Sequence, residues 1–209
     1  MGYSHMRDDD PQSLNDDLKR TFTISNPPGS ERVEITVRKH GPATALLWKH
    51  LLRIPLELPV LGIDGNRAFG LPFDEAVSSG PKSIFIAAGV GITPLLAQAS
   101  AVFASKQELE VLWSLRTGDI ALAEDSFRKC SPLKAVARLF LTGAGGNEEK
   151  VSEMLEMGAM VERRRMSAED VIAQKGKGYK FFLCTSPGMR NEVSRWLDGE
   201  EVVWEDFGY

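Results

Sequence analysis

Two patterns of hydrophobic and polar residues divide the chain near residue 79. Before it, apolar and polar side chains alternate in residues 20–25 and 32–38. This predicts two half-buried antiparallel strands joined by the turn sequence Asn26-Pro27-Pro28-Gly29. A short helix and another strand are predicted next, over residues 43–52 and 56–60. These elements are too few for an independent barrel, whose smallest closed forms need roughly five strands.

Beyond this point, continuous apolar runs alternate with stretches of helical periodicity. Continuous rather than alternating runs are typical of strands that are buried on both faces of a sheet. The regular order of strand and helix predicts an α/β fold, with a parallel sheet of about five or six strands and helices on both faces. The predicted strands are 83–88, 108–115, 137–142, 180–186 and 202–207, and the predicted helices are 93–105, 119–129, 148–157, 167–174 and 187–197.

Composition and charge exclude several classes of protein. A formal net charge of −4 over 209 residues argues against a nucleic-acid-binding protein. No apolar run reaches the roughly 18 residues that span a bilayer. Two cysteines, Cys130 and Cys184, cannot hold an iron–sulfur cluster or a four-cysteine zinc site, so no metal is expected. The polar start carries no signal peptide, which predicts a cytoplasmic protein with reduced thiols.

The strongest local signal is the turn Gly89-Val90-Gly91-Ile92-Thr93-Pro94, which follows a buried strand and opens a helix. Glycine allows the backbone to approach a pyrophosphate closely, and the free N–H groups of a first helical turn attract its charge. Pro94 suits an early helical position because it has no N–H to leave unpaired. A plain strand–turn–helix corner is the alternative, but the complete string in this context favours nucleotide binding.

Three weaker signals stand elsewhere in the chain. The first strand opens with Arg20-Thr21-Phe22-Thr23, where arginine suits a phosphate and an aromatic ring suits a planar cofactor. A predicted strand ends in Cys184-Thr185-Ser186-Pro187-Gly188-Met189, at the sheet edge where ligands gather. The chain closes with Glu205-Asp206-Phe207-Gly208. Taken singly, these fit an ordinary edge strand, a buried structural cysteine and a core aromatic equally well.

Taken together and in order, RTFT, GVGITP, CTSPGM and EDFG resemble the motifs of the ferredoxin–NADP reductase superfamily, over residues 19–209. The resemblance implies a partial FAD-binding β domain over residues 19–78, in the form of an incomplete antiparallel β-barrel. It also implies an NAD(P)-binding domain over 79–209. We interpret residues 1–18 as a vector remnant and a polar leader. Phe22 replaces the tyrosine of the family motif, and the upstream barrel strands are missing, so the chain resembles a truncated member.

The resemblance also implies roles for individual residues. Those nearest the reacting atoms are Thr23 at flavin N5, Cys184 beside the nicotinamide, and Glu205, which with Phe207 closes the site. The expected FAD contacts are Arg20, Thr21, Phe22, Thr23, Val37, Gly41, Pro42, Ala43 and Thr44. The expected NAD(P) contacts are Gly89, Val90, Gly91, Ile92, Thr93, Pro94, Ser114, Arg116, Cys184, Ser186, Pro187, Gly188 and Met189.

The function implied is that of a flavin-dependent oxidoreductase. A hydride passes from NAD(P)H to FAD, and electrons continue to an acceptor domain or protein outside this chain. NADH is favoured over NADPH, because residues 137–142 end without a second basic residue to accompany Arg116. The triple arginine at 163–165 is interpreted as a solvated loop, and the oligomeric state stays open.

Two alternative functions are kept. The first is a non-catalytic nucleotide-binding or interaction module left from a larger reductase. The second is a flavin-free Rossmann dehydrogenase, which would carry a third glycine where Pro94 stands and an acidic residue roughly 20 positions later.

Overall fold

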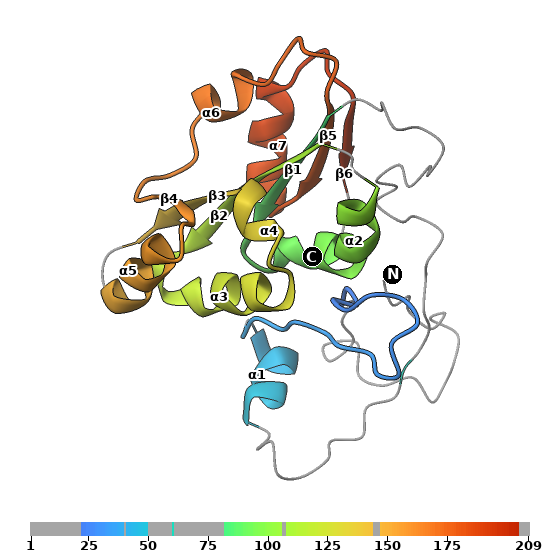
Figure 1. Ribbon diagram of the computed structural model, residues 1–209, viewed down its shortest axis with the longest axis vertical. Helices are drawn as coiled ribbons and strands as arrows, with labels where there is room; N and C mark the ends of the chain where they lie inside the picture. Colours follow the sequence, from blue (N-terminus) through green and yellow to red (C-terminus); the bar gives the residue numbers. More distant parts are fainter. Residues whose placement is uncertain are drawn as a thin grey trace.

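A parallel sheet is the centre of the structure. The computed structural model describes residues 22–39, 41–49, 60, 82–105, 108–143 and 147–204. Its six strands follow the order β4-β3-β2-β1-β5-β6, and every neighbouring pair is parallel (Figure 1). The strands are β1 (Ser83–Ala88), β2 (Leu109–Arg116), β3 (Ala137–Thr142), β4 (Met160–Glu162), β5 (Lys180–Cys184) and β6 (Val202–Trp204). The α/β fold with a parallel sheet predicted from the sequence is confirmed.

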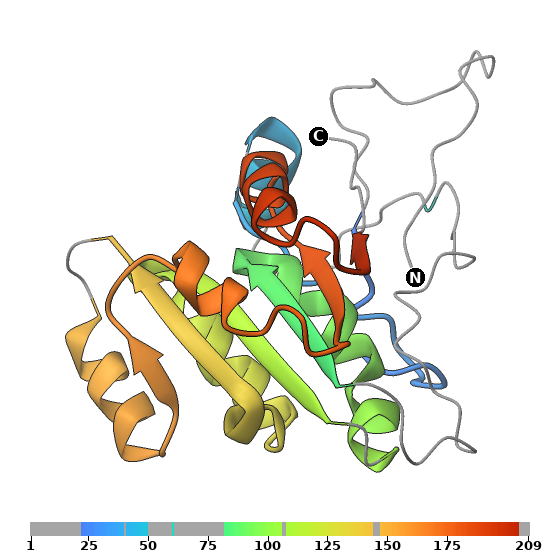
Figure 2. The same cartoon turned by 90° about the horizontal axis from the view of Figure 1, so that it is seen from above.

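Helices cover both faces of this sheet, as Figure 2 shows. One face carries α2 (Thr93–Ala104), α3 (Ile120–Lys129), α4 (Leu133–Val136) and α5 (Glu148–Glu156), and the other carries α6 (Ala168–Ile172) and α7 (Pro187–Trp196). Successive residues of β1 enter opposite cores: Phe85 lies under α2 and α3, while Ile84 and Ile86 lie on the side of α6 and α7. All three are fully buried, which explains why the strand is apolar without alternation.

Between residues 83 and 204 the elements follow the sequence pattern closely, but short ones escaped prediction. The missed elements are β4, α4 and two turns of 3-10 helix, η2 (Gly89–Ile92) and η3 (Thr117–Asp119). With three or four residues each, they do not repeat a pattern often enough to reveal a period. Among the described residues, no helix is long and apolar enough to cross a membrane.

The N-terminal segment, residues 22–39 together with α1 (Gly41–Lys49), lies beside the sheet domain (Figure 1). The predicted antiparallel pairing occurs as one bridge between Ile24 and Ile35, next to a 2.8 Å hydrogen bond from the Ser25 N–H to the Glu34 carbonyl. The helix begins two residues before its predicted start. Three predictions fall outside the described residues: the leader, the domain boundary at 78–79 and most of the strand over 56–60.

Two ion pairs join this segment to the sheet domain. Arg38 Nη2 lies 3.0 Å from Asp119 Oδ2, and Lys129 Nζ lies 2.8 Å from Glu34 Oε2. The hydrogen bond to Glu34 raises the pKa of Lys129 above its ordinary value. Both pairs are partly exposed and add little to stability, but they mark where the two parts of the chain meet.

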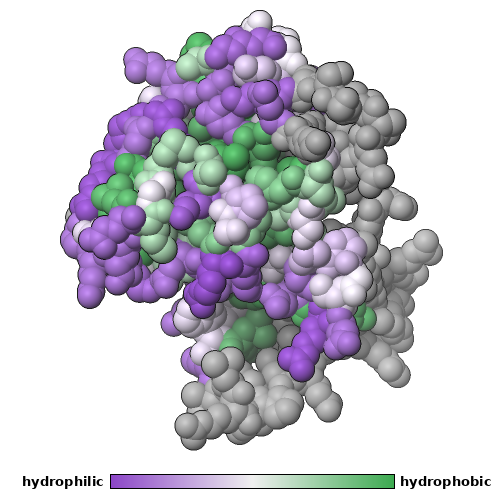
Figure 3. All heavy atoms as spheres, in the orientation of Figure 1, coloured by the Kyte–Doolittle hydropathy of each residue, from purple (hydrophilic) through white to green (hydrophobic). Residues whose placement is uncertain are grey.

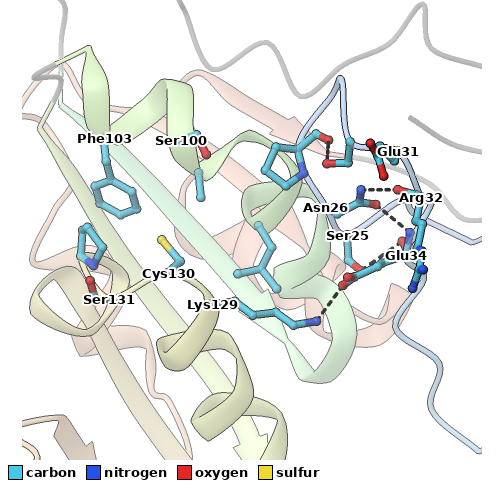
Figure 4. A pocket seen from close by; sticks show the side chains of 15 residues that line it. Ser25, Asn26, Glu31, Arg32, Glu34, Ser100, Phe103, Lys129, Cys130 and Ser131 are labelled. Atoms are coloured by element: carbon cyan, nitrogen blue, oxygen red, sulfur yellow. Dashed lines mark hydrogen bonds and ion pairs between the residues drawn. The ribbon is translucent and has the colours of Figure 1, made fainter.

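A groove of about 770 Å³ follows this junction (Figure 4). It runs between the N-terminal segment, the α2 side chains Ser100 and Phe103, and the turn from α3 to α4, which carries Cys130. Desolvation raises the pKa of the Cys130 thiol above its ordinary value. In Figure 3, hydrophobic residues gather across the middle of the visible face, with hydrophilic residues around its rim.

Candidate functional site

The order of the strands places a crevice beside β1. The chain moves outward from β1 through β2 and β3 to β4, and then returns to the other side of β1 as β5. Ligands of open α/β sheets bind at such a reversal, outside the carboxyl ends of the strands. The two segments that follow β1 and β5 are Gly89–Pro94 and Thr185–Met189, which are two of the four motifs found in the sequence.

These two motifs touch at Gly91. A Cβ atom placed on Gly91 would lie 1.9 Å from the Cys184 carbonyl oxygen and 3.3 Å from its Sγ. Only glycine therefore fits, because any side chain would displace the end of β5. Cys184 itself is 1% exposed. The glycine-rich turn and the cysteine segment are thus in contact in the folded chain.

The turn is held in shape from β2. Gly89 has a φ of +54°, a left-handed conformation that favours glycine. Its carbonyl oxygen accepts a 2.9 Å hydrogen bond from Nε1 of Trp113, whose side chain is fully buried. Sequence analysis did not single out Trp113. A signal existed, because a tryptophan in a strand buried on both faces needs an acceptor for its N–H.

The start of α2 is not capped by a side chain. Thr93 Oγ1 donates back to the Val90 carbonyl at 2.9 Å, and Pro94 occupies the first turn. No acidic residue lies in that turn. The helix therefore presents its positive end to the crevice, which is the arrangement that attracts a phosphate.

The remaining residues expected to contact NAD(P) lie along the same edge of the sheet. Ser114 is in register with Ala88, and Arg116 is the exposed last residue of β2. Ser186, Pro187 and Gly188 are exposed where α7 begins. Met189 is half-buried and packs against the core beneath α7.

Of the motif Arg20-Thr21-Phe22-Thr23, which the resemblance assigns to the flavin, the structure describes Phe22 and Thr23. Phe22 and Val37 are half-buried, whereas Thr23 is buried and its Oγ1 has no hydrogen-bond partner. An unsatisfied buried hydroxyl costs about 1–3 kcal/mol, so such a group is a candidate for contact with a ligand.

The next residues expected to contact FAD lie at the start of α1. Gly41 has a φ of +74°, which favours glycine, and Thr44 is buried within the first turn. Pro42 and Ala43 contribute backbone to this turn. Arg20, Thr21, Glu205 and Phe207 lie outside the described residues.

Arg38 is a site residue that sequence analysis missed. Besides its ion pair with Asp119, its Nη1 lies 4.0 Å from the position that a Cβ on Gly89 would take. A cation from the N-terminal segment thus lies against the glycine turn of the sheet domain. The signal was present in the alternation of residues 32–38, which sets Arg38 on the face opposite to Val37.

The described part of the chain contains no cluster of histidine, cysteine and acidic residues that would hold a metal ion.

No family model matches the sequence, and no curated protein matches it. Solved structures do match. The flavohemoglobin from Malassezia yamatoensis with bound FAD and heme aligns with a TM-score of 0.55 at 20% identity, covering 90% of this chain and 47% of that one. The flavohem-like FAD/NAD-binding domain of nitric oxide dioxygenase from Vibrio cholerae O1 biovar El Tor gives 0.62 at 15%, covering 89% and 76%.

A cytochrome P450 reductase from Amycolatopsis gives a TM-score of 0.60 at 16% identity, covering 90% of this chain and 56% of that one. This chain thus spans about half the length of the flavohemoglobin and of the P450 reductase. At these identities the likeness is one of fold. The chain has the fold of reductase domains like those of ferredoxin–NADP reductase, as its motifs implied.

Proposed function

We propose that the chain is a flavin-dependent NAD(P)H oxidoreductase module, in which a hydride passes from NAD(P)H to FAD and electrons leave to an acceptor outside the chain. The observation that carries this proposal is the contact between Gly91 and Cys184 at the reversal of the sheet. It joins a phosphate-binding helix start to the strand end that the resemblance assigns to the nicotinamide.

On the nucleotide side, the turn at Gly89–Pro94 would hold the pyrophosphate through its backbone N–H groups. Arg38, which is paired with Asp119, lies beside this turn, and the exposed Arg116 ends β2 at the same edge of the sheet. Cys184 would border the nicotinamide, and its buried thiol offers a small, apolar wall rather than an acid or a base. These residues bind and orient the ring.

On the flavin side, Thr23 would donate its unpartnered hydroxyl to the edge of the ring, and Phe22 would lie against the ring face. Gly41 and Thr44 open a helix whose first turn suits the FAD phosphates. When bound, FAD accepts the two electrons of a hydride and passes them on singly. The protein contributes proximity and orientation to this transfer, without a general acid or base.

The domain division fits this assignment. Residues 19–78 would form the flavin-binding part and residues 79–209 the nucleotide-binding part, with Arg38 and Asp119 at their junction. Glu205 and Phe207 would close the site from the end of the chain. The electron acceptor would be another domain or protein, because no redox group besides FAD is expected within this chain.

Separate titrations of FAD, NADH and NADPH by calorimetry test the proposal. Binding of FAD and of a nicotinamide nucleotide is expected, with Thr23→Val weakening only FAD and Gly91→Ala weakening only the nucleotide. Gly118→Ala is the matched control, since its Cβ would meet no atom within 4 Å. A wild-type chain that binds none of the three ligands would overturn the assignment.

One observation favours a second candidate, a nucleotide-binding module without turnover. Among the described residues, the two segments predicted as antiparallel strands share one bridge, Ile24–Ile35, which is less pairing than the FAD-binding barrel of the resemblance would show. In that case the same titrations give nucleotide binding and no FAD binding.

A further inference from the structure

The three consecutive arginines Arg163–Arg165, here called the arginine segment, follow the edge strand β4. Parallel pairing sets Glu162 beside Phe140, so the segment continues past the end of β3 toward the edge of the sheet that carries the glycine turn. Sequence analysis interpreted the segment as a solvated loop. All three residues are exposed and lie outside any helix or strand, as interpreted, and they also line a cavity.

This cavity has a volume of about 440 Å³, within the range of small-molecule sites, roughly 300–1,000 Å³. Thr117, directly after β2, and Gly143, directly after β3, line it together with Glu148 at the start of α5 and the arginine segment. Neighbouring strands lie about 4.8 Å apart, so the ends of β1 and β3 are separated by roughly 10 Å. A dinucleotide whose pyrophosphate rested on the turn after β1, with its nicotinamide at the end of β5 as proposed, would extend its adenosine end toward this cavity.

Arg164 fixes the segment. Its Nη1 and Nη2 donate to Asp170 Oδ2 and Oδ1 at 2.7 and 2.6 Å, a two-pronged pair with a carboxylate that is 6% exposed. Asp170 also accepts hydrogen bonds from Arg138 and from the Ser167 backbone, at 3.1 and 2.8 Å. These bonds, above all those from Arg164, hold the pKa of Asp170 well below its usual range. The middle arginine is thus structural, and it anchors its two neighbours.

Those two neighbours keep positive charge at the cavity. Arg163 pairs with Glu148, and both side chains are more than half exposed. Within the described part of the chain, Arg165 has no ion pair and is exposed. Arg138, Arg163 and Arg164 pair with the three carboxylates at 148, 162 and 170, so Arg165 leaves the group with one excess positive charge. Glu148 is the carboxylate that an incoming anion would displace from Arg163.

We propose that this cavity binds the 2′-phosphate of an adenosine nucleotide through Arg163 and Arg165, so that the chain selects NADPH over NADH, and that Glu148 limits the strength of this selection. The inference rests on the proposed nucleotide site. Arginine binds phosphate through two parallel hydrogen bonds, and an arginine beside the adenosine ribose accommodates a 2′-phosphate. The expectation of NADH depended on the lack of a second basic residue at the end of β3, and β4 supplies that charge from another part of the sequence.

Calorimetric titration with 2′-phospho-AMP and with 5′-AMP tests the proposal, and needs neither flavin nor turnover. We expect 2′-phospho-AMP to bind at least about tenfold more tightly than 5′-AMP. Arg163→Ala and Arg165→Ala should each remove about tenfold of this preference, the size of one charge-assisted hydrogen bond at an exposed site. Glu148→Gln should tighten 2′-phospho-AMP while leaving 5′-AMP unchanged.

The control is Arg128→Ala, which removes an exposed arginine that pairs with Asp125 on α3 and leaves the preference intact. Equal affinity for the two nucleotides, or a preference that survives both arginine substitutions, would overturn the selection of the 2′-phosphate and leave the nucleotide site standing. If neither nucleotide binds, both the selection and the proposed nucleotide site fail. Melting curves of each variant show whether a loss of binding follows from unfolding.

Discussion

Replacing Gly91 by alanine is the sharpest perturbation of the proposed site, because it adds one methyl group at the contact between the two nucleotide motifs. The new Cβ would lie 1.9 Å from the Cys184 carbonyl oxygen, and such contacts essentially never fall below 3.0 Å. The turn and the end of β5 must therefore separate by about 1.1 Å, the difference between these two distances. The atom met is backbone at the end of a central strand, which cannot rotate away.

Two effects follow, and they are measured separately. Overpacking of this kind costs about 1–3 kcal/mol of stability, which lowers Tm by roughly 2–12 °C in a chain of this size. A displacement of about 1 Å at a binding turn can weaken function about 100-fold. Calorimetry with NADPH should therefore show a loss of affinity of about 10- to 100-fold, while FAD binding stays unchanged.

Gly118→Ala provides the comparison, because its added methyl group meets nothing. It should match the wild-type chain in both melting temperature and NADPH affinity. The reasoning is refuted if Gly91→Ala melts with the wild-type chain and binds NADPH equally well. That result would mean that the turn and the strand end do not meet as described.

Three further substitutions test separate parts of the account. Thr23→Val removes the unpartnered hydroxyl. The free energy of unfolding in urea should rise by about 1 kcal/mol, and the affinity for FAD should fall. A fall of about 1 kcal/mol in the free energy of unfolding would show that the hydroxyl has a partner in the folded chain. Trp113→Phe leaves the Gly89 carbonyl without its 2.9 Å donor; melting and NADPH titration should show about 1 kcal/mol less stability and weaker binding, and no change in either would contradict this. Asp170→Asn should cost about 2 kcal/mol near neutral pH. The depressed pKa of Asp170 means that its stabilisation is complete above the unfolded carboxyl pKa of about 4 and is lost as the pH falls. The gap between wild type and variant should therefore narrow below about pH 4, and a gap that is constant with pH would count against the ion pair.

The parallel sheet was predictable from sequence because buried strands leave long apolar runs. Residues 83–88 and 137–142 were predicted with their observed bounds for this reason. The glycine turn was predictable because its function depends on residue types that backbone geometry demands, as the crowding at Gly91 shows. Local pattern and local chemistry agreed at these places.

What escaped prediction depends on contacts between distant segments. β4 has three residues, too few for the sequence to show the alternation of a strand. Its pairing with β3 nevertheless decides where the arginine segment lies. Arg38 pairs with Asp119, which lies 81 positions later in the sequence. Charged residues in such places look like solvated surface in the sequence, and only the fold shows what they face.

The most direct test of the central claim is the visible absorbance of the chain loaded with FAD, recorded without oxygen before and after one equivalent of NADPH is added. Hydride transfer within this chain predicts that the band of oxidised flavin bleaches, and that Gly91→Ala slows the bleaching. A flavin that stays oxidised while both FAD and NADPH are bound would contradict the account.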